Sequence, residues 1–459
     1  MNSTDTICAI STPAGVGGIA VLRLSGTDAK QLAEASLQSA SGRAVRLADH
    51  KATFAHLHTN EGFLDEVVAT LFAAPHSYTG ETVVELSCHG SLYVQQRMLQ
   101  HFISRGARLA EPGEFTLRAF LNRRLDLSQA EAVADLIDAR SQSAHRLAVS
   151  QMRGGYAQEL ESLRKRLIDL AALLELELDF SDEEVEFANR KALRQTTDEL
   201  RTRVAQLVGT FQSGNALKHG VPVAIVGRPN VGKSTLLNAL LHEERAIVSD
   251  QAGTTRDTVE ELFTIDGIQF RLIDTAGIRH TENSVEQAGI ERSRKAAEQA
   301  MVVLYVVEEN DDASAVTQAI EDMKATLSLD DKRLMVVRNK CDRQTTSTAV
   351  GSMLGPWPVV SLSAKYGTGL DDLRKQMVAA ATQGIGQQDV LLTNARHYEA
   401  LNHVLEALGE VLQGMEVDLP SDLLVVDIRD ALYHLGTITG KVTPDDILST
   451  IFSRFCIGK

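Results

Sequence analysis

Residues 227–234 read Gly-Arg-Pro-Asn-Val-Gly-Lys-Ser and directly follow an apolar run at 221–226. This pattern predicts a phosphate-binding loop between a buried strand and a helix, because glycines let backbone N–H groups turn toward phosphate oxygens. In such loops Lys233 would reach the β- and γ-phosphates, the Ser234 hydroxyl would ligate Mg²⁺, and the helix would add its positive dipole end. The ligand class is therefore a nucleoside triphosphate with Mg²⁺, which an ATPase and a GTPase share.

Two further segments predict contacts to Mg²⁺ and the γ-phosphate. Asp274-Thr-Ala-Gly277 follows an apolar run, so its Asp would hold Mg²⁺ through water and Gly277 would present its backbone N–H to the γ-phosphate. Gly253-Thr-Thr-Arg-Asp257 lies where a switch loop belongs, and either Thr254 or Thr255 would supply the second hydroxyl on Mg²⁺. Asp266-Gly267 predicts a hairpin turn pairing residues 259–265 with 270–273.

The base is indicated by Asn339-Lys-Cys-Asp342, which follows an apolar run at 334–337. A carboxylate accepts from both N1–H and N2–H₂ of guanine, whereas adenine has no N1 donor and would leave the Asp342 charge unpaired. Ser363-Ala-Lys365 follows another apolar run and would back the base. All five motifs stand in order at the carboxyl ends of predicted strands, where α/β folds bind ligands, so the sequence predicts a GTPase domain.

The residue after the Asp-Thr-Ala-Gly motif is Ile278, where many signalling GTPases carry a Gln that orients the attacking water. An aliphatic side chain cannot orient water. Either hydrolysis is slow without help or another residue substitutes, and the residues alone leave Arg256, Arg279, Glu282 and Glu286 open.

The chain of 459 residues is too long for one core, and its patterns change along its length. Residues 1–118 alternate apolar runs at 19–24, 66–72 and 83–86 with helical stretches near 28–38 and 91–105, which predicts an α+β domain. Residues 119–213 and 380–459 are helical, with a capping box expected at Ser128 and Glu131, an exposed acidic turn at 179–186 and clear helices at 395–412 and 421–435. We predict one discontinuous all-α domain into which an α/β GTPase domain, 214–379, is inserted.

Composition limits the remaining options. The net charge of −15 argues weakly against direct nucleic-acid binding, and the basic clusters at 123–124, 153 and 164–166 are more simply solvated helix faces. No apolar run approaches the length of a membrane span, and no secretory signal is visible. The cysteines Cys8, Cys88, Cys341 and Cys456 show no metal-ligand spacing, so a reduced, cytoplasmic location is expected.

The chain resembles the MnmE (TrmE) family of tRNA-modifying GTPases over its full length. The resemblance rests on the terminal Cys456-Ile-Gly-Lys459 and on the segments 5–7, 17–18, 77–81, 112–115 and 121–127, besides the GTPase motifs. It implies a folate-binding N-terminal domain and modification of the tRNA wobble uridine at position 5, giving aminomethyl or carboxymethylaminomethyl groups. It also implies a homodimer that works with an FAD-dependent partner in a heterotetramer.

The resemblance assigns further roles within the GTPase domain. A K⁺ ion would be held by Asn230, Ser249, Gln251 and Thr254, while Thr255 would join Ser234 on Mg²⁺, and Glu286 would orient the attacking water. K⁺ binding would accompany dimerisation of the GTPase domains. The full expected GTP-binding set is Asn230, Val231, Gly232, Lys233, Ser234, Thr235, Ser249, Asp250, Gln251, Ala252, Gly253, Thr254, Thr255, Asp274, Thr275, Ala276, Gly277, Asn339, Lys340, Asp342, Ser363, Ala364 and Lys365.

In the N-terminal domain the resemblance implies that Arg23, Glu85, Arg124 and Lys459 hold a 5-formyl- or methylene-tetrahydrofolate. Cys456 would act in the folate or tRNA chemistry, and Cys8, Cys88 and Cys341 are expected to be packing residues. A rival hypothesis is a GTP-dependent switch in ribosome or ribonucleoprotein assembly with no chemistry beyond GTP hydrolysis. The folate positions and Cys456 discriminate the two, because a pure switch needs neither.

Overall fold

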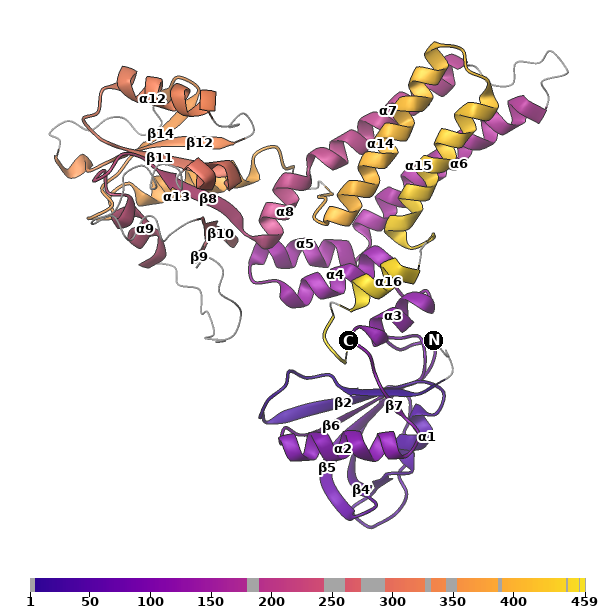
Figure 1. Cartoon of the computed structure of the whole chain (residues 1–459). Coiled ribbons are helices and arrows are strands. Elements are labelled where there is room, and N and C mark those ends of the chain that lie inside the picture. Colours follow the sequence, from indigo (N-terminus) through magenta and orange to yellow (C-terminus); the bar gives the residue numbers. More distant parts are fainter. Residues whose placement is uncertain are drawn as a thin grey trace. The chain divides into compact units, whose positions relative to one another are not determined.

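The computed structural model describes residues 5–179, 190–242, 261–273, 294–326, 332–343, 353–386, 390–442, 445–453 and 455–458. They form two compact units (Figure 1). One unit comprises Met1–Ala134, Gln151–Asn189 and Gly414–Lys459, and the other comprises Asp135–Ser150 and Arg190–Gln413. Within the described residues, none of the helices has the length and apolar character needed to cross a membrane.

The N-terminal region is a seven-stranded sheet of order β3-β4-β5-β6-β2-β1-β7. Its strands are β1 Ile7–Ile10, β2 Ile19–Ser25, β3 Leu37–Gln38, β4 Ala52–Thr59, β5 Gly62–Phe72, β6 Val83–His89 and β7 Arg108–Leu109. Helices α1 (Ala29–Glu34) and α2 (Leu92–Ser104) bury Ala33, Met98 and Phe102 against the alternate apolar residues of one face. The predicted strands are present, but α1 is shorter than predicted, because the chain turns at Ala35 and Leu37 pairs with Leu57 in β4.

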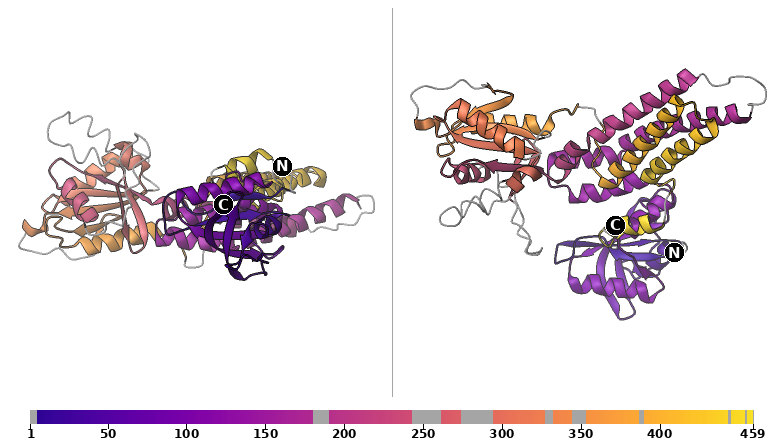
Figure 2. Two further views of the ribbon diagram at one scale, coloured as in Figure 1. Left: turned by 90° about the horizontal axis from the view of Figure 1, so that it is seen from below. Right: turned by 45° about the horizontal axis from the view of Figure 1, so that its top comes forward.

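Helices follow: α3 Glu114–Leu121, α4 Leu127–Asp138, α5 Gln142–Met152, α6 Gly155–Asp179, α7 Arg190–Gly209 and α8 Phe211–His219. After the second sheet come α14 Ala395–Glu416, α15 Ser421–Thr439 and α16 Asp445–Phe452. Helix α15 packs along α6 (Figure 2), and Phe211 of α8 stacks on Tyr398 of α14 with ring centroids 4.4 Å apart. Segments that are far apart in sequence therefore pack together, as a discontinuous helical region requires.

The predicted capping box of α4 is wrong by two residues. Asp126 accepts from the Gln129 N–H at 2.9 Å, and Gln129 Oε1 accepts from the Asp126 N–H at 3.0 Å. This is the reciprocal arrangement of a capping box, and the Ser128 hydroxyl only donates to Asp126 at 2.7 Å. The helix begins at Leu127, so Ser128 is already inside its first turn.

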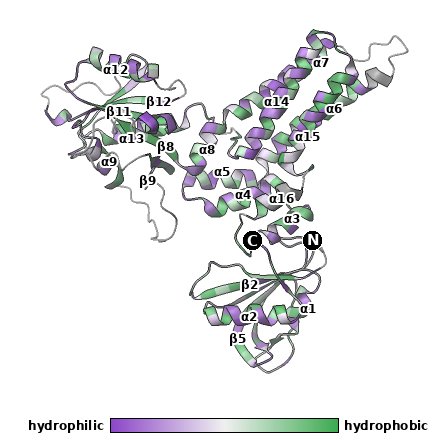
Figure 3. Cartoon of the chain, viewed as in Figure 1, coloured by the Kyte–Doolittle hydropathy of each residue, from purple (hydrophilic) through white to green (hydrophobic). Residues whose placement is uncertain are grey.

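The second sheet belongs to the GTPase region and has the order β13-β14-β12-β11-β8-β10-β9. Its strands are β8 Val221–Val226, β9 Glu261–Ile265, β10 Ile268–Leu272, β11 Val302–Glu308, β12 Arg333–Asn339, β13 Met353–Leu354 and β14 Trp357–Ser361. The central strands are parallel and the two edge strands antiparallel. The apolar colouring of β8 and β11 in Figure 3 matches their burial on both faces.

Helices cover both faces of this sheet. Helices α9 (Lys233–His242) and α13 (Leu370–Thr382) bury Leu236, Leu240, Leu373 and Met377 on one face, together with α8. On the other face, α12 (Ala313–Thr326) buries Val316 and Ile320. The predicted hairpin is present: Ile265 pairs with Ile268, and Asp266 and Gly267 have φ of 48° and 76°, as a two-residue turn of this kind requires. The predicted fold class is confirmed; the predicted domain limits stay a prediction.

Candidate functional site

The phosphate loop joins β8 to α9, and its backbone is shaped by glycines and one asparagine. Gly232 has φ of 97° and Asn230 has φ of 65°. A Cβ on Gly232 would overlap the Asn339 side-chain amide, and a Cβ on Gly227 would overlap the Val306 carbonyl. Close backbone approach to neighbouring strands therefore requires glycine at both positions.

Lys233 begins α9, and its ammonium lies over its own loop. Nζ donates to the Gly227 carbonyl at 2.8 Å and to the Arg228 carbonyl at 2.7 Å. Burial lowers the pKa of Lys233. Ser234 and Thr235 follow in the first helical turn, with Ser234 half-buried and Thr235 exposed. The loop, the lysine and the hydroxyls thus stand in the order that triphosphate binding requires.

Asn339 connects the phosphate loop to the base-recognition loops. Its Nδ2 donates to the Val231 carbonyl at 2.9 Å. Its Oδ1 accepts from the backbone N–H of Ala364 at 3.0 Å and of Lys340 at 2.8 Å. Only 3% of Asn339 is exposed, so these bonds are shielded from water. Three predicted segments, from β8, β12 and β14, are therefore brought to one edge of the sheet.

Three more predicted side chains lie near this end of the strands. Lys340 Nζ donates to the Asn230 carbonyl at 2.8 Å and also to Glu308. Asp342 is exposed, and its Oδ1 accepts from the Ser363 hydroxyl at 2.5 Å, which leaves its carboxylate facing solvent and oriented. Lys365 lies over the ring of Tyr366, 5.0 Å from its centroid. The carboxylate is thus held in place to accept from a base.

Several predicted residues lie outside the described residues, and nothing is added about their positions. They are Ser249, Asp250, Gln251, Ala252, Gly253, Thr254, Thr255, Asp274, Thr275, Ala276, Gly277, Glu286 and Lys459, and the residues 256, 278, 279, 282 and most of the acidic stretch 179–186.

A second cluster lies on the N-terminal sheet, where β2 pairs with β6. Arg23 faces Glu85 in register and donates to its Oε1 from Nε at 2.9 Å and from Nη2 at 2.8 Å. The guanidinium lies 5.5 Å from the ring centroids of both Tyr78 and Phe115. Within the described residues, Glu85 Oε2 accepts no hydrogen bond. The cluster therefore offers a fixed cation and an open carboxylate oxygen.

The C-terminal residues join this cluster. The Gly458 carbonyl accepts from Arg23 Nη1 at 3.3 Å and from the Ser11 hydroxyl at 3.2 Å. Gly458 has φ of 96°, and a Cβ there would lie 3.0 Å from the Ser11 Cα. Cys456 is exposed, and its carbonyl accepts from the Gly113 N–H at 3.5 Å. The structure thus brings Arg23 and Glu85 together with the tail.

Arg124 lies next to the loop that carries Tyr78. A Cβ on Gly80 would lie 3.2 Å from the Arg124 Cγ, and among the described residues the hydrogen bonds of the Glu85 carboxylate come from Arg23 and not from Arg124. Cys8 and Cys88 are buried, and burial raises the pKa of each thiol to about 11. Burial, with Glu309 and Asp342, also raises the pKa of the partly exposed Cys341.

Sequence reasoning missed a charged network beneath this cluster. Arg118, only 7% exposed, donates to Asp5, Glu81 and Glu114, and Arg108 donates to Asp5 and Glu114. The segments 5–7, 77–81 and 112–115, which carry part of the family resemblance, contribute its carboxylates. In the sequence, these segments share only an acidic residue next to an aromatic or small residue. That pattern does not show that the acidic residues bind the same arginines.

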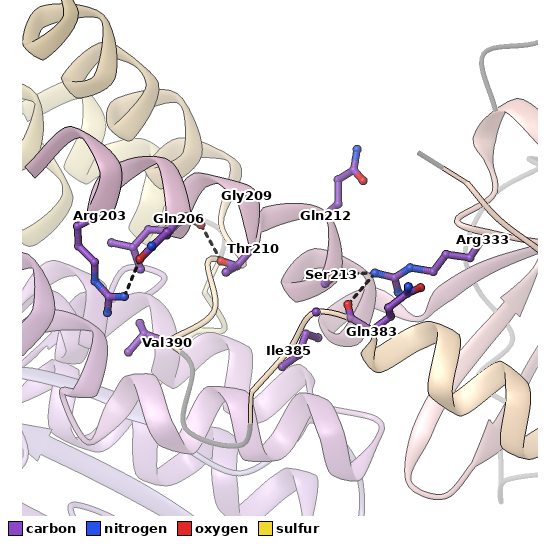
Figure 4. A pocket seen from close by; sticks show the side chains of 12 residues that line it. Arg203, Gln206, Gly209, Thr210, Gln212, Ser213, Arg333, Gln383, Ile385 and Val390 are labelled. Carbon is purple, nitrogen blue, oxygen red and sulfur yellow. Dashed lines mark hydrogen bonds between the residues drawn. The ribbon is translucent and has the colours of Figure 1, made fainter. Parts of the chain in front are cut away.

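A separate pocket of about 440 Å³ lies between α7, α8, the start of β12 and the segment after α13. Figure 4 shows Arg333 at its edge, where the guanidinium donates to Ser213 Oγ at 3.3 Å, to the Gln383 carbonyl at 3.0 Å and to the Ala380 carbonyl. Of the predicted GTP-binding residues that the structure describes, none lines this pocket. It is therefore distinct from the nucleotide site.

Comparison with known proteins agrees with this geometry. Residues 127–456 match the model of the MnmE helical domain, and residues 6–124 match that of the GTP-binding protein TrmE N-terminus. The chain is 46% identical to the tRNA modification GTPase MnmE of Christiangramia forsetii over 100% of both chains. It is also 46% identical to that of Bacteroides thetaiotaomicron over 99% of both.

Among solved structures, the G domain of the T. maritima FeoB iron transporter is 23% identical and covers 35% of this chain and 98% of its own, with a TM-score of 0.25. Era in complex with MgGDPNP and nucleotides of 16S ribosomal RNA is 28% identical and covers 40% of this chain and 65% of its own, with a TM-score of 0.26. The full-length matches decide the family. The chain belongs to the MnmE family of tRNA modification GTPases.

Proposed function

We propose that this GTPase is K⁺-activated and homodimeric, and that it modifies the tRNA wobble uridine at position 5 with a one-carbon unit from tetrahydrofolate. An FAD-dependent partner would act with it in a heterotetramer. The observation that carries the proposal is the cluster of Arg23, Glu85 and the Cys456–Gly458 tail, built across more than 430 residues of sequence. A switch that only hydrolyses GTP has no use for such a cluster.

The residues present fit a folate. The open Oε2 of Glu85 would accept from the amino groups of the pterin, while Arg23 holds Oε1 and fixes the carboxylate. Arg124 and Lys459 would add positive charge toward the anionic tail of the cofactor. When bound, tetrahydrofolate supplies a one-carbon unit at the formyl or methylene level. Cys456 is exposed and so accessible to that chemistry.

The residues of the phosphate loop fit GTP with two cations. Lys233 would exchange its two loop carbonyls for phosphate oxygens, and Ser234 with Thr255 would ligate Mg²⁺. The exposed Asn230 makes no side-chain hydrogen bond within the described residues, so its amide oxygen is free to ligate K⁺ with Ser249, Gln251 and Thr254. A bound K⁺ would place positive charge where other GTPases use an arginine finger. Glu286 would then orient the water.

The cation proposal is tested by GTP turnover. We expect faster hydrolysis in KCl than in NaCl at equal ionic strength, and equal rates would overturn K⁺ activation. Asn230→Ala should keep GTP affinity within about twofold but lose the K⁺ stimulation, because its backbone carbonyl still binds Lys340. A variant that loses affinity instead would assign Asn230 to the loop structure alone.

The tRNA proposal is tested in cells. Nucleoside analysis of bulk tRNA from a strain lacking the gene should show wobble uridines without the position-5 group, restored by the wild-type gene. Arg23→Ala should fail to restore them while keeping GTP turnover, because Arg23 lies in the N-terminal sheet and not in the GTP site. Unchanged wobble uridines in the deletion strain would reject the proposal.

A further inference from the structure

The first turn of α5 contacts the turn of the β9–β10 hairpin, although more than a hundred residues separate them in sequence. The Ser143 N–H donates to the Gly267 carbonyl at 3.0 Å. Gln142 lies against Gly267 so closely that a Cβ on Gly267 would stand 2.9 Å from the Gln142 Cβ. Both segments belong to the same compact unit.

Helix α5 is itself fixed to the GTPase region. The Ser143 hydroxyl donates to the Leu217 carbonyl of α8 at 3.3 Å, and Lys218 pairs with Asp135 of α4 at 2.8 Å. Leu147 packs against the apolar core beneath the second sheet. Ser141 caps the helix by accepting from the Ala144 N–H at 3.1 Å, so the Ser143 N–H remains available to Gly267.

The β9–β10 hairpin lies in sequence between the predicted switch segment and Asp274, and it pairs with the strand that leads into the phosphate loop. Strand β9 directly follows the predicted switch segment in sequence, and β10 ends two residues before Asp274. Strand β9 is the edge strand, and β10 pairs with β8, which leads into the phosphate loop. Any displacement of the hairpin along β8 must move its turn, and that turn is bonded to α5.

We propose that the bond from the Ser143 N–H to the Gly267 carbonyl transmits nucleotide-dependent displacement of the β9–β10 hairpin to the α4–α5 segment, and so couples GTP hydrolysis to tRNA modification. The proposal rests on the GTPase and tRNA modification activities of the family and not on K⁺ or folate. It requires the hairpin turn to carry a small residue, because Gln142 fills the space beside it.

Gly267→Ala tests the contact, since the added methyl group must push the turn away from Gln142. Gly355→Ala is a matched control: it stands in the turn at the opposite edge of the same sheet with φ of 60°, and a Cβ there meets nothing closer than 3.8 Å. Both variants place an alanine at a positive φ and so introduce similar backbone strain, but only Gly267→Ala disturbs α5. We expect both to keep the KM for GTP within about twofold, and Gly267→Ala alone to lower tRNA modification by at least about fivefold.

Replacing Gln142 by Gly in the Gly267→Ala background should restore modification, because it removes the overlapping side chain. Normal modification by Gly267→Ala, or an equal loss in Gly355→Ala, would overturn the proposal. The wild-type gene in the same strain tests the tRNA modification role separately from the contact between α5 and the hairpin. If the wild-type gene fails to restore modification, the tRNA role itself is rejected.

A measurement on the wild-type protein tests the same contact without relying on variants, which could fail to fold. Hydrogen exchange of the peptide covering residues 141–150 should differ between the GDP-bound and GTP-analogue-bound protein, because the Ser143 N–H is one of its protected amides. Identical exchange in both nucleotide states would overturn the proposal.

Discussion

Asn339 shows how one side chain organises a nucleotide site. Its amide group joins the phosphate loop at Val231 to the base loops at Lys340 and Ala364, and it is almost completely buried. Because each bond is made to backbone, the three loops hold a fixed spacing without depending on other side chains. The motif residues can therefore be identified in the sequence, but their mutual support is visible only in the structure.

The neighbouring Asp342 is the residue predicted to select the base. In Asp342→Asn we expect GTP affinity to fall by on the order of 10²-fold or more, because the amide cannot accept from both guanine donors. The amide N–H₂ would instead donate to the O2 of xanthine, so affinity for xanthosine triphosphate should rise. Fluorescent-nucleotide titration measures both. Asp371→Asn, on an exposed position of α13, is the control, and unchanged GTP affinity in Asp342→Asn would contradict the assignment.

The cysteines differ in exposure, and so in reactivity. At about pH 8 we expect Cys456 to react first with a thiol reagent and Cys341 more slowly, while Cys8 and Cys88 react only after unfolding, because burial raises the pKa of both to about 11. Stopped-flow absorbance with a chromogenic disulfide resolves the phases. Cys456→Ser should abolish the fastest phase; its persistence would mean that another thiol is exposed.

At the scale of elements, local patterns predicted more than long-range pairing did. The Asp266-Gly267 turn was predictable because two-residue hairpins require positive φ, and the parallel strands were predictable from their apolar runs. The cap of α4 was misplaced because Asp126-x-x-Gln129 and Ser128-x-x-Glu131 both fit the capping pattern. Only the backbone shows which residue precedes the first helical turn.

The charged network around Arg118 could not be predicted, since its partners are up to 113 residues apart. Burial opposes ionisation of Asp5 and Glu114, but hydrogen bonds from Arg108 and Arg118 outweigh it and lower the pKa of both carboxyls. Their stabilisation is therefore complete above the unfolded values of 3.8 and 4.5 and is lost as the pH falls through the lower folded values. The network makes the N-terminal domain acid-sensitive.

Arg118→Gln should destabilise the N-terminal domain by about 3 kcal/mol, because Glu81 loses its ion pair and the buried Glu114 keeps only Arg108 as a cation. Urea unfolding followed by circular dichroism should show this loss at neutral pH and a flatter pH dependence below about pH 5. The protein provides its own control: Trp357, the single tryptophan, lies in the GTPase sheet, so its fluorescence transition should not move. A shift of the tryptophan transition alone would contradict the assignment.

At the scale of the whole molecule, one compact unit combines two segments that are separate in the sequence, 135–150 and 190–413. Residues 135–150 belong to the helical stretch by pattern, yet they pack with the GTPase region through Leu147, Ser143 and Asp135. Helical periodicity identified α5 as a helix but carried no information about which core it joins. The hydrogen bonds from Ser143 to the Gly267 and Leu217 carbonyls show which core α5 joins. Both acceptors are backbone carbonyls, so the side-chain pattern of the sequence could not predict these bonds.

Arg333 joins the GTPase sheet to the helix before it and the helix after it, by reaching Ser213 of α8 and capping the carboxyl end of α13. In Arg333→Gln we expect faster protease cleavage near residues 383–392, because two carbonyls lose a charged donor, about 1–2 kcal/mol in total. GTP affinity should stay within about twofold, since Asn339, one of the residues predicted to bind GTP, lies at the other end of β12. Limited proteolysis with and without GTP measures both effects; an unchanged cleavage rate would contradict the capping role.

The hydrogen bond from Arg23 to the Gly458 carbonyl joins residues that the ribosome makes at very different times. The two residues are 435 positions apart, so at bacterial translation speeds roughly 20 to 90 s pass between their syntheses. Once β7 at Arg108–Leu109 has been made, all seven strands of the N-terminal sheet exist, with Arg23 and Glu85 among them, but the tail does not yet exist. A chain released before residue 458 would contain the phosphate loop and Asn339 but would lack the carbonyl that Arg23 binds, so the N-terminal cluster forms after these GTPase residues are made.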